Sequence, residues 1–169
     1  MAADTTKSLD SIGSGTLPDQ GIDSESATDI DLGIDLGTTR TVVARADRGN
    51  YPVISFTDEH GDEHDFIPSL TALHEGVLVH GFAARRAAHH GAPLLRSLKR
   101  VLASPTLTAS TPVRLGDQTF SVLEVLTSYL RHLKSELADR GIDITRARVV
   151  VAVPAHAYGA QRLLTLEAF

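Results

Sequence analysis

Two segments rich in β-branched and aliphatic residues lie close together, and their spacing constrains the fold more than any other feature. They span residues 31–37 and 41–46, and only Thr38, Thr39 and Arg40 separate them. A parallel pair of strands needs a long crossover, so this short connection predicts an antiparallel hairpin. A turn at 47–50 and an apolar segment at 52–56 predict a third strand after it.

The middle of the sequence predicts further short strands and helices. The clearest is a helix over about 122–140, with a capping box formed by Ser121 and Glu124 and with Gly141 placed to end it. Before it we expect a polar loop at 57–65, strands at 69–73 and 77–79, helices at 82–89 and 94–102, and a second hairpin with strands at 113–115 and 119–121.

The last part of the sequence predicts a strand and then a helix. The near-continuous apolar run 148–153 is typical of a strand buried on both faces, and Pro154 ends it. An amphipathic helix is expected from Gly159 onward, and the sequence reaches Phe169 without a helix-stop residue. We therefore expect an α/β unit whose last two elements begin something that these residues do not complete.

Charge divides the sequence into two parts. Residues 1–29 carry six acidic side chains against Lys7 alone, which accounts for the whole net charge of −5. This segment has no apolar periodicity, so we expect a disordered acidic tail before a single domain at 30–169. It has neither the basic start nor the apolar stretch of a secretory signal, and we expect a cytoplasmic protein.

Composition excludes several classes of protein. The absence of cysteine excludes a disulfide framework and a cysteine-built zinc site. No apolar run reaches the length of a membrane-spanning helix, and the acidity argues against a nucleic-acid partner. His60 and His64, like the adjacent His89 and His90, lack the arrangement of a metal site, and we expect them to be exposed polar residues.

The connection of the first hairpin carries the first candidate chemistry. Asp35 ends a strand, and Gly37, Thr38 and Thr39 follow at once. Successive backbone amides and hydroxyls in such a turn can bind phosphate oxygens, and the carboxylate can hold Mg²⁺ directly or through water. Taken alone, the residues are equally consistent with a plain hairpin turn.

Two other motifs are weaker when considered separately. Lys99, followed by Arg100 on an expected helix, could neutralise a γ-phosphate and order an attacking water, although a solvated basic surface is the commoner explanation. The apolar run that ends in Pro154 is followed by Gln161 and Arg162, which also fits a buried strand, a stop and a helix.

Together and in this order, the motifs resemble the heat shock protein 70 (DnaK-type) chaperones, in the amino-terminal half of their actin-like ATPase domain. The resemblance covers about 31–169, and the segments that carry it are 34–39, 66–69, 81–88, 98–102, 151–155 and 160–162. Sugar kinases and actin-like filament proteins share the first motif. The Lys-Arg pair and the spacing from Pro154 to Arg162 favour the chaperones.

The resemblance implies a fold and a site. The fold would be lobe I of an actin-like (ribonuclease H-like) ATPase, incomplete here, with ATP or ADP and Mg²⁺ in a cleft between two lobes. Asp35 and Lys99 would be the catalytic residues, with Asp35 beside Mg²⁺ and Lys99 at the γ-phosphate. The phosphates would contact Gly37, Thr38, Thr39 and Arg40, and the relay to a substrate domain would include Pro154 and Arg162. Arg40 replaces a small or amide residue and could add a phosphate contact or crowd the loop.

The resemblance also implies a function, a stress-response chaperone that hydrolyses ATP and acts on unfolded polypeptides with co-chaperones. The family's second phosphate loop and adenosine-binding part have no counterpart in these residues. We therefore expect weak or absent ATP hydrolysis by the chain alone, and a complementary second-lobe chain as one partner. The alternative is a non-catalytic interaction module, a remnant that binds another protein through its unfinished lobe.

Overall fold

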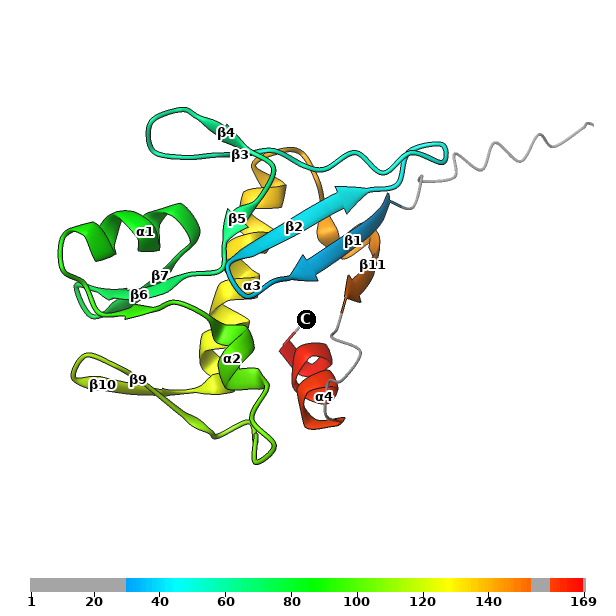
Figure 1. Cartoon of the computed structure of the whole chain (residues 1–169). Helices are drawn as coiled ribbons and strands as arrows, with labels where there is room; N and C mark the ends of the chain where they lie inside the picture. Colours follow the sequence, from blue (N-terminus) through cyan, green and yellow to red (C-terminus); the bar gives the residue numbers. More distant parts are fainter. Residues whose placement is uncertain (1–29, 153–158, 169) are drawn as a thin grey trace, which may run out of the picture.

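The computed structural model describes residues 30–152 and 159–168, so the expected tail 1–29, Pro154 and Phe169 lie outside the described residues. The main sheet has four strands in the order β11-β1-β2-β5 (Figure 1). Their bounds are Ile30–Leu36 for β1, Arg40–Arg45 for β2, Ile67–Pro68 for β5 and Ala147–Ala152 for β11. The predicted hairpin is confirmed, because β1 and β2 are antiparallel.

The core lies between one face of this sheet and α3, Val122–Ala138, which runs behind the sheet in Figure 1. Leu32, Ile34 and Val43 point to this side and are buried. From α3 the core receives Val125, Leu126, Leu133 and Leu137. The predicted capping box is confirmed, since Ser121 N–H donates to the Glu124 carboxylate at 2.6 Å and Glu124 N–H to Ser121 Oγ at 3.2 Å.

The prediction that residues 148–153 form a strand buried on both faces is wrong. β11 pairs in parallel with β1, and its residues alternate between partly buried and exposed. Val150 is 65% exposed, because its side of the sheet is not covered by any element in 30–152 or 159–168. Within the described residues, β11 therefore has one face toward solvent, and it stands at the edge of the sheet because it pairs with β1 alone.

A second group of elements extends from the end of β5. The antiparallel strands β6 (Thr71–His74) and β7 (Val77–His80) lead into α1 (Gly81–His89), as predicted to within about two residues. The helix predicted at 94–102 is wrong in its first half, since Leu94 and Leu95 form β8 and pair with β6. The short α2, Leu98–Leu102, begins after Ser97, whose hydroxyl caps it.

The remaining elements are short. The strand predicted at 52–56 is wrong except at its end, where β3 (Phe56–Thr57) pairs with β4 (Glu63–His64). Pro52 lacks an amide hydrogen, and before Phe56 the segment follows β2 with one bridge, between Val53 and Ala44. The hairpin of β9 (Pro112–Leu115) and β10 (Gln118–Ser121) is confirmed.

The last described elements are the 3₁₀ helix η1 (Ile144–Arg146), which leads into β11, and α4 (Gly159–Ala168), which packs against α3. In the described part of the chain, no helix is long and apolar enough to cross a membrane.

Candidate functional site

The turn between β1 and β2 has a shape that requires glycine at one position. β1 ends at Leu36, and Gly37 N–H donates back to the carbonyl of Asp35 at 3.1 Å. A Cβ atom on Gly37 would lie 2.3 Å from the carbonyl oxygen of Arg40, which is closer than atoms can approach. The glycine of the expected phosphate loop therefore stands where the backbone of Arg40 leaves no room for a side chain.

The side chains that follow Gly37 lie at the surface. Thr38, Thr39 and Arg40 are exposed, and the Thr39 carbonyl accepts a hydrogen bond from Ser69 N–H at 3.1 Å. The Arg40 guanidinium lies over the Phe66 ring, 5.0 Å from its centre. The two threonine hydroxyls are thus open to a ligand, while the arginine packs on the segment before β5.

The structure brings together the two residues predicted to be catalytic, which are far apart in the sequence. Lys99 Nζ on α2 lies 3.9 Å from Asp35 Oδ1 at the end of β1, and the two side chains are 26% and 61% exposed. An exposed pair at this distance adds little to stability. It does place a carboxylate that can attract a cation beside an ammonium group that can attract an anion.

A small cavity lies beneath this turn. Its volume is about 30 Å³, enough for one or two water molecules and too small for a base or sugar. Gly37 and Lys99 contribute to its lining, together with leucine side chains and the buried residues Thr41, Ser69, Thr71, Tyr129 and Thr165. The described residues therefore offer groups for phosphate and its cation at the surface, above a small cavity that leucines and buried hydroxyls line together.

Of the two residues predicted for the relay, Pro154 lies outside the described residues. Arg162 is on α4 with an exposed side chain. Nothing in the described part of the chain tests their role.

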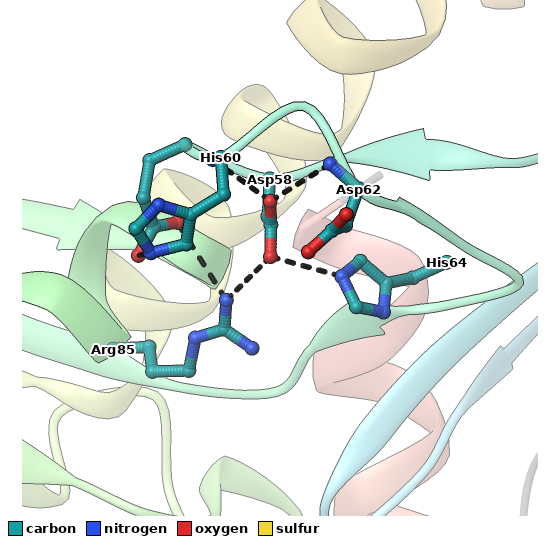
Figure 2. A network of polar contacts seen from close by, with 6 residues as sticks. Asp58, His60, Asp62, His64 and Arg85 are labelled. Carbon is teal, nitrogen blue, oxygen red and sulfur yellow. Dashed lines mark hydrogen bonds and ion pairs between the residues drawn. The ribbon is translucent and has the colours of Figure 1, made fainter.

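The side chain of His64 and the backbone amide of His60 belong to a hydrogen-bonded network around Asp58. The Asp58 carboxylate accepts hydrogen bonds from His64 Nε2 at 3.0 Å and Arg85 Nη2 at 2.9 Å, and from the backbone amides of His60 and Asp62 (Figure 2). The hydrogen bond with His64 contributes most to holding the pKa of Asp58 well below its usual range. His64 is only 25% exposed, so the expectation of an exposed residue is wrong there, whereas His60, His89 and His90 are exposed.

No metal-binding group of three or more His, Asp or Glu side chains occurs within 30–152 and 159–168.

Sequence reasoning missed the buried polar residues behind the turn. Tyr129 OH donates to Thr41 Oγ1 at 2.8 Å, and Thr41 Oγ1 lies 3.0 Å from Ser69 Oγ. His80 joins Thr71 Oγ1 through Nδ1 at 3.0 Å and Ser128 Oγ through Nε2 at 2.8 Å. The one signal in the sequence was a tyrosine, which has a polar end, on the apolar face of the 122–140 helix.

Comparison with known proteins confirms the resemblance to DnaK-type chaperones. The chain is 31% identical over 142 residues to the chaperone protein DnaK of Mesomycoplasma hyopneumoniae strain J, and the match covers 84% of this chain and 22% of the relative. It is 30% identical over 138 residues to the chaperone protein DnaK of Mycoplasma mycoides subsp. mycoides SC, and this match covers 81% of this chain and 22% of the relative. The figure for the chaperone protein DnaK of Metamycoplasma hominis is 28% over 137 residues, covering 81% and 21%.

No protein-family model matches the chain. The chain spans about a fifth of the length of the curated relatives it matches.

Proposed function

We propose that this chain, which is similar to DnaK-type chaperones over most of its length, forms lobe I of an actin-like ATPase domain and binds the phosphate end of Mg-ATP or Mg-ADP. The observation that carries the proposal is the approach of Lys99 Nζ to Asp35 Oδ1 at 3.9 Å, beside the tight turn at Gly37. Two motifs 64 residues apart in the sequence thereby meet at one surface.

Each part of this surface has a chemical task in the proposal. Asp35 holds Mg²⁺, most simply through its water shell, because Mg²⁺ prefers oxygen ligands and gives up water reluctantly. The hydroxyls of Thr38 and Thr39 and the backbone of the turn donate to phosphate oxygens. Lys99 neutralises the γ-phosphate and orders the attacking water, as phosphoryl transfer relies on positioning and charge.

Hydrolysis is proposed to need more than these residues. Transfer of a phosphoryl group is fast when the group is clamped from several sides and shielded from bulk water. The described residues contact a ligand from one side, and the 30 Å³ cavity has no room for the adenosine part. We propose that an opposing lobe, from polypeptide outside these residues or from a complementary chain, completes the cleft.

The cellular role is proposed from the relatives, which are named chaperones. With the cleft complete, nucleotide state would control the binding of unfolded polypeptides, with co-chaperones as further partners and the cytoplasm as the location. Pro154 and Arg162 would carry the signal to a substrate-binding part.

The test is a calorimetric titration of the chain with Mg-ATP. Saturable binding is expected, and Asp35→Asn should weaken it by at least about tenfold, since the loss of one charge contact costs roughly 1.5–3 kcal/mol. Asp117→Asn, in the exposed turn between β9 and β10, is the matched control and should bind as the unchanged chain does. A chain that is folded by circular dichroism and binds no nucleotide would overturn the proposal and favour the non-catalytic interaction module.

A further inference from the structure

Three buried hydroxyl groups lie in a row behind the turn at Gly37. They belong to Thr41 on β2, Ser69 just after β5, and Tyr129 on α3, and the three residues are 0%, 8% and 4% exposed. Tyr129 OH is 2.8 Å from Thr41 Oγ1, which is 3.0 Å from Ser69 Oγ. Residues that are 28 and 88 positions apart in sequence are thereby joined in one hydrogen-bonded row.

This row is attached to the turn at two points. Thr41 is the second residue of β2, so only Arg40 separates it from the turn residues Thr38 and Thr39. Ser69 N–H donates to the carbonyl of Thr39 at 3.1 Å, which holds the turn from the other side. A shift of the Thr41 or Ser69 side chain would therefore change the position of Thr38 and Thr39, whose side chains face the proposed phosphate position.

Tyr129 is the fixed end of the row. It lies on α3, the helix with the capping box, and its ring packs edge-on against the ring of His80 at 5.7 Å between centres. Burial raises the pKa of Tyr129 to about 12, so the phenol keeps its proton and is a donor. Its hydroxyl lies 2.8 Å from Thr41 Oγ1 and 3.4 Å from the carbonyl oxygen of Pro68, the residue before Ser69, so the shorter bond goes to Thr41. The Thr41 hydroxyl can then donate to Ser69, which leaves the Ser69 hydrogen free to point into the cavity beneath Gly37 and Lys99.

We propose that Tyr129 is a positioning residue for the phosphate-binding turn, acting through Thr41 and Ser69 to fix Thr38 and Thr39 in place. The expected effect on nucleotide binding rests on the proposed function. The ordering of the turn by Tyr129 does not depend on a ligand. Tyr129 does not touch the phosphate position; it sets the geometry of the groups that do. In this proposal, the conformation of the turn depends on α3, the helix that packs against one face of the main sheet.

The first experiment measures amide hydrogen exchange in the chain without nucleotide. Tyr129→Phe keeps the ring and removes only the hydroxyl, and Tyr51→Phe removes a hydroxyl from a residue that is 72% exposed. In Tyr129→Phe the Ser69 amide should exchange roughly three to ten times faster, because one hydrogen bond that stabilises the closed state of the turn is lost. The core amides of Leu126 and Leu133 should keep their exchange rates. Equal acceleration of all these amides, or none at Ser69, would overturn the inference.

A second pair of variants tests the route through Thr41. Thr41→Val removes the hydroxyl at nearly constant volume and should accelerate the Ser69 amide as Tyr129→Phe does. Thr41→Ser retains the hydroxyl and should restore the slow rate. If Tyr129→Phe does not fold, this pair decides the question alone, and a slow Ser69 amide in Thr41→Val would count against the row of hydroxyls.

Titration with Mg-ATP then separates the two proposals. If the unchanged chain binds, Tyr129→Phe should bind about three to ten times more weakly and Tyr51→Phe equally well. Unaltered affinity in Tyr129→Phe would refute the positioning role. If the unchanged chain binds nothing, the proposed function fails, and the exchange rate of the Ser69 amide still decides whether Tyr129 orders the turn.

Discussion

Two polar loops of this molecule contain similar residues and differ in what surrounds them. The β1–β2 turn has Asp35 followed by Gly37, and the β3–β4 loop has Asp58 followed by Gly61. The Asp58 side chain is 4% exposed and accepts four hydrogen bonds, whereas that of Asp35 is 61% exposed with Lys99 at 3.9 Å. A carboxylate whose acceptor positions are filled by the protein stabilises the fold; one that faces water remains available to a ligand.

The filled loop also connects two parts of the structure. Arg85 comes from α1 and pairs with both Asp58 at 2.9 Å and Glu59 at 3.6 Å, as the close view in Figure 2 shows for Asp58. The β3–β4 hairpin is thereby fastened to the helix. We expect substitutions in this loop to change stability, and those in the β1–β2 turn to change binding.

The largest loss of stability is expected from Asp58→Asn. The new amide group would turn a donor toward Arg85 or His64, which are donors themselves, and would remove the negative charge between them. Urea unfolding should show a clear fall in the midpoint, larger than for any other variant proposed here. Asp62→Asn is the control, because that residue holds Asp58 through its backbone amide. An unchanged midpoint in Asp58→Asn would end the distinction between the two loops.

The buried His80 and the buried carboxylate of Asp58 should lower the stability of the fold in different pH ranges. Burial, and secondarily the nearby His132, lower the pKa of His80 to about 4. The unfolded chain takes up this proton from about pH 6.5 downward and the folded chain does not, so stability falls between about pH 6.5 and 4, by up to about 3 kcal/mol. The pKa of Asp58 is also lowered, so the stability that its carboxylate contributes is lost only as the pH falls below the ordinary aspartate value of 3.8.

Unfolding at pH 7 and pH 4.5 measures this difference. His80→Gln should reduce the fall between these two values, since a glutamine takes up no proton, while His132, whose pKa burial also lowers, contributes to the part that remains. His90→Gln, at an exposed position, should leave the fall unchanged. The histidine assignment is wrong if both variants follow the unchanged chain.

Gly37→Ala tests whether the open turn is held as tightly as its geometry requires. The added Cβ would meet the Arg40 carbonyl at 2.3 Å, so the turn must move, at a cost of roughly 1–3 kcal/mol and with loss of Mg-ATP binding. Gly33→Ala, on β1 shortly before the turn, is the matched control, because a Cβ there meets nothing within 4 Å. Equal stability and equal binding in the two variants would show that the turn adapts freely.

The smallest effect is expected from Arg40→Gln. The guanidinium lies over Phe66 at 5.0 Å, an exposed contact of about 0.5–1 kcal/mol. Stability should fall by no more than this, and Mg-ATP affinity should change little because the side chain packs on Phe66. A large loss of affinity in the titration would mean that Arg40 leaves the ring to contact phosphate.

Local patterns in the sequence were sufficient for elements held together by neighbours in the chain. The first hairpin and α3 follow from turn spacing and a capping box, because their interactions lie within a few residues. The segment at 94–102 failed because Leu94 and Leu95 satisfy a helical pattern and a strand edge equally well, and only β6 decides between them. The residues next to Leu94 and Leu95 in the sequence do not indicate that a distant strand pairs with them.

The candidate site divides in the same way. The proximity of Asp35 and Lys99 was expected from resemblance to a family whose motifs occur in the same order. The hydrogen bond from Tyr129 to Thr41 joins positions 88 residues apart, and no local pattern announces it. Likewise, burial of β11 depends on what covers the sheet, which the apolar run 148–153 does not specify.

The uncovered face of the main sheet has a practical consequence for handling the protein. Register places Val150, Gly33, Ala44 and Val53 side by side in one apolar row across three strands and the segment beside β2. In the described part of the chain β11 pairs with β1 alone, so its other edge offers a template for strand addition. Solubility will therefore set the working concentration, and a single lysine at the 65%-exposed Val150 position should raise that limit.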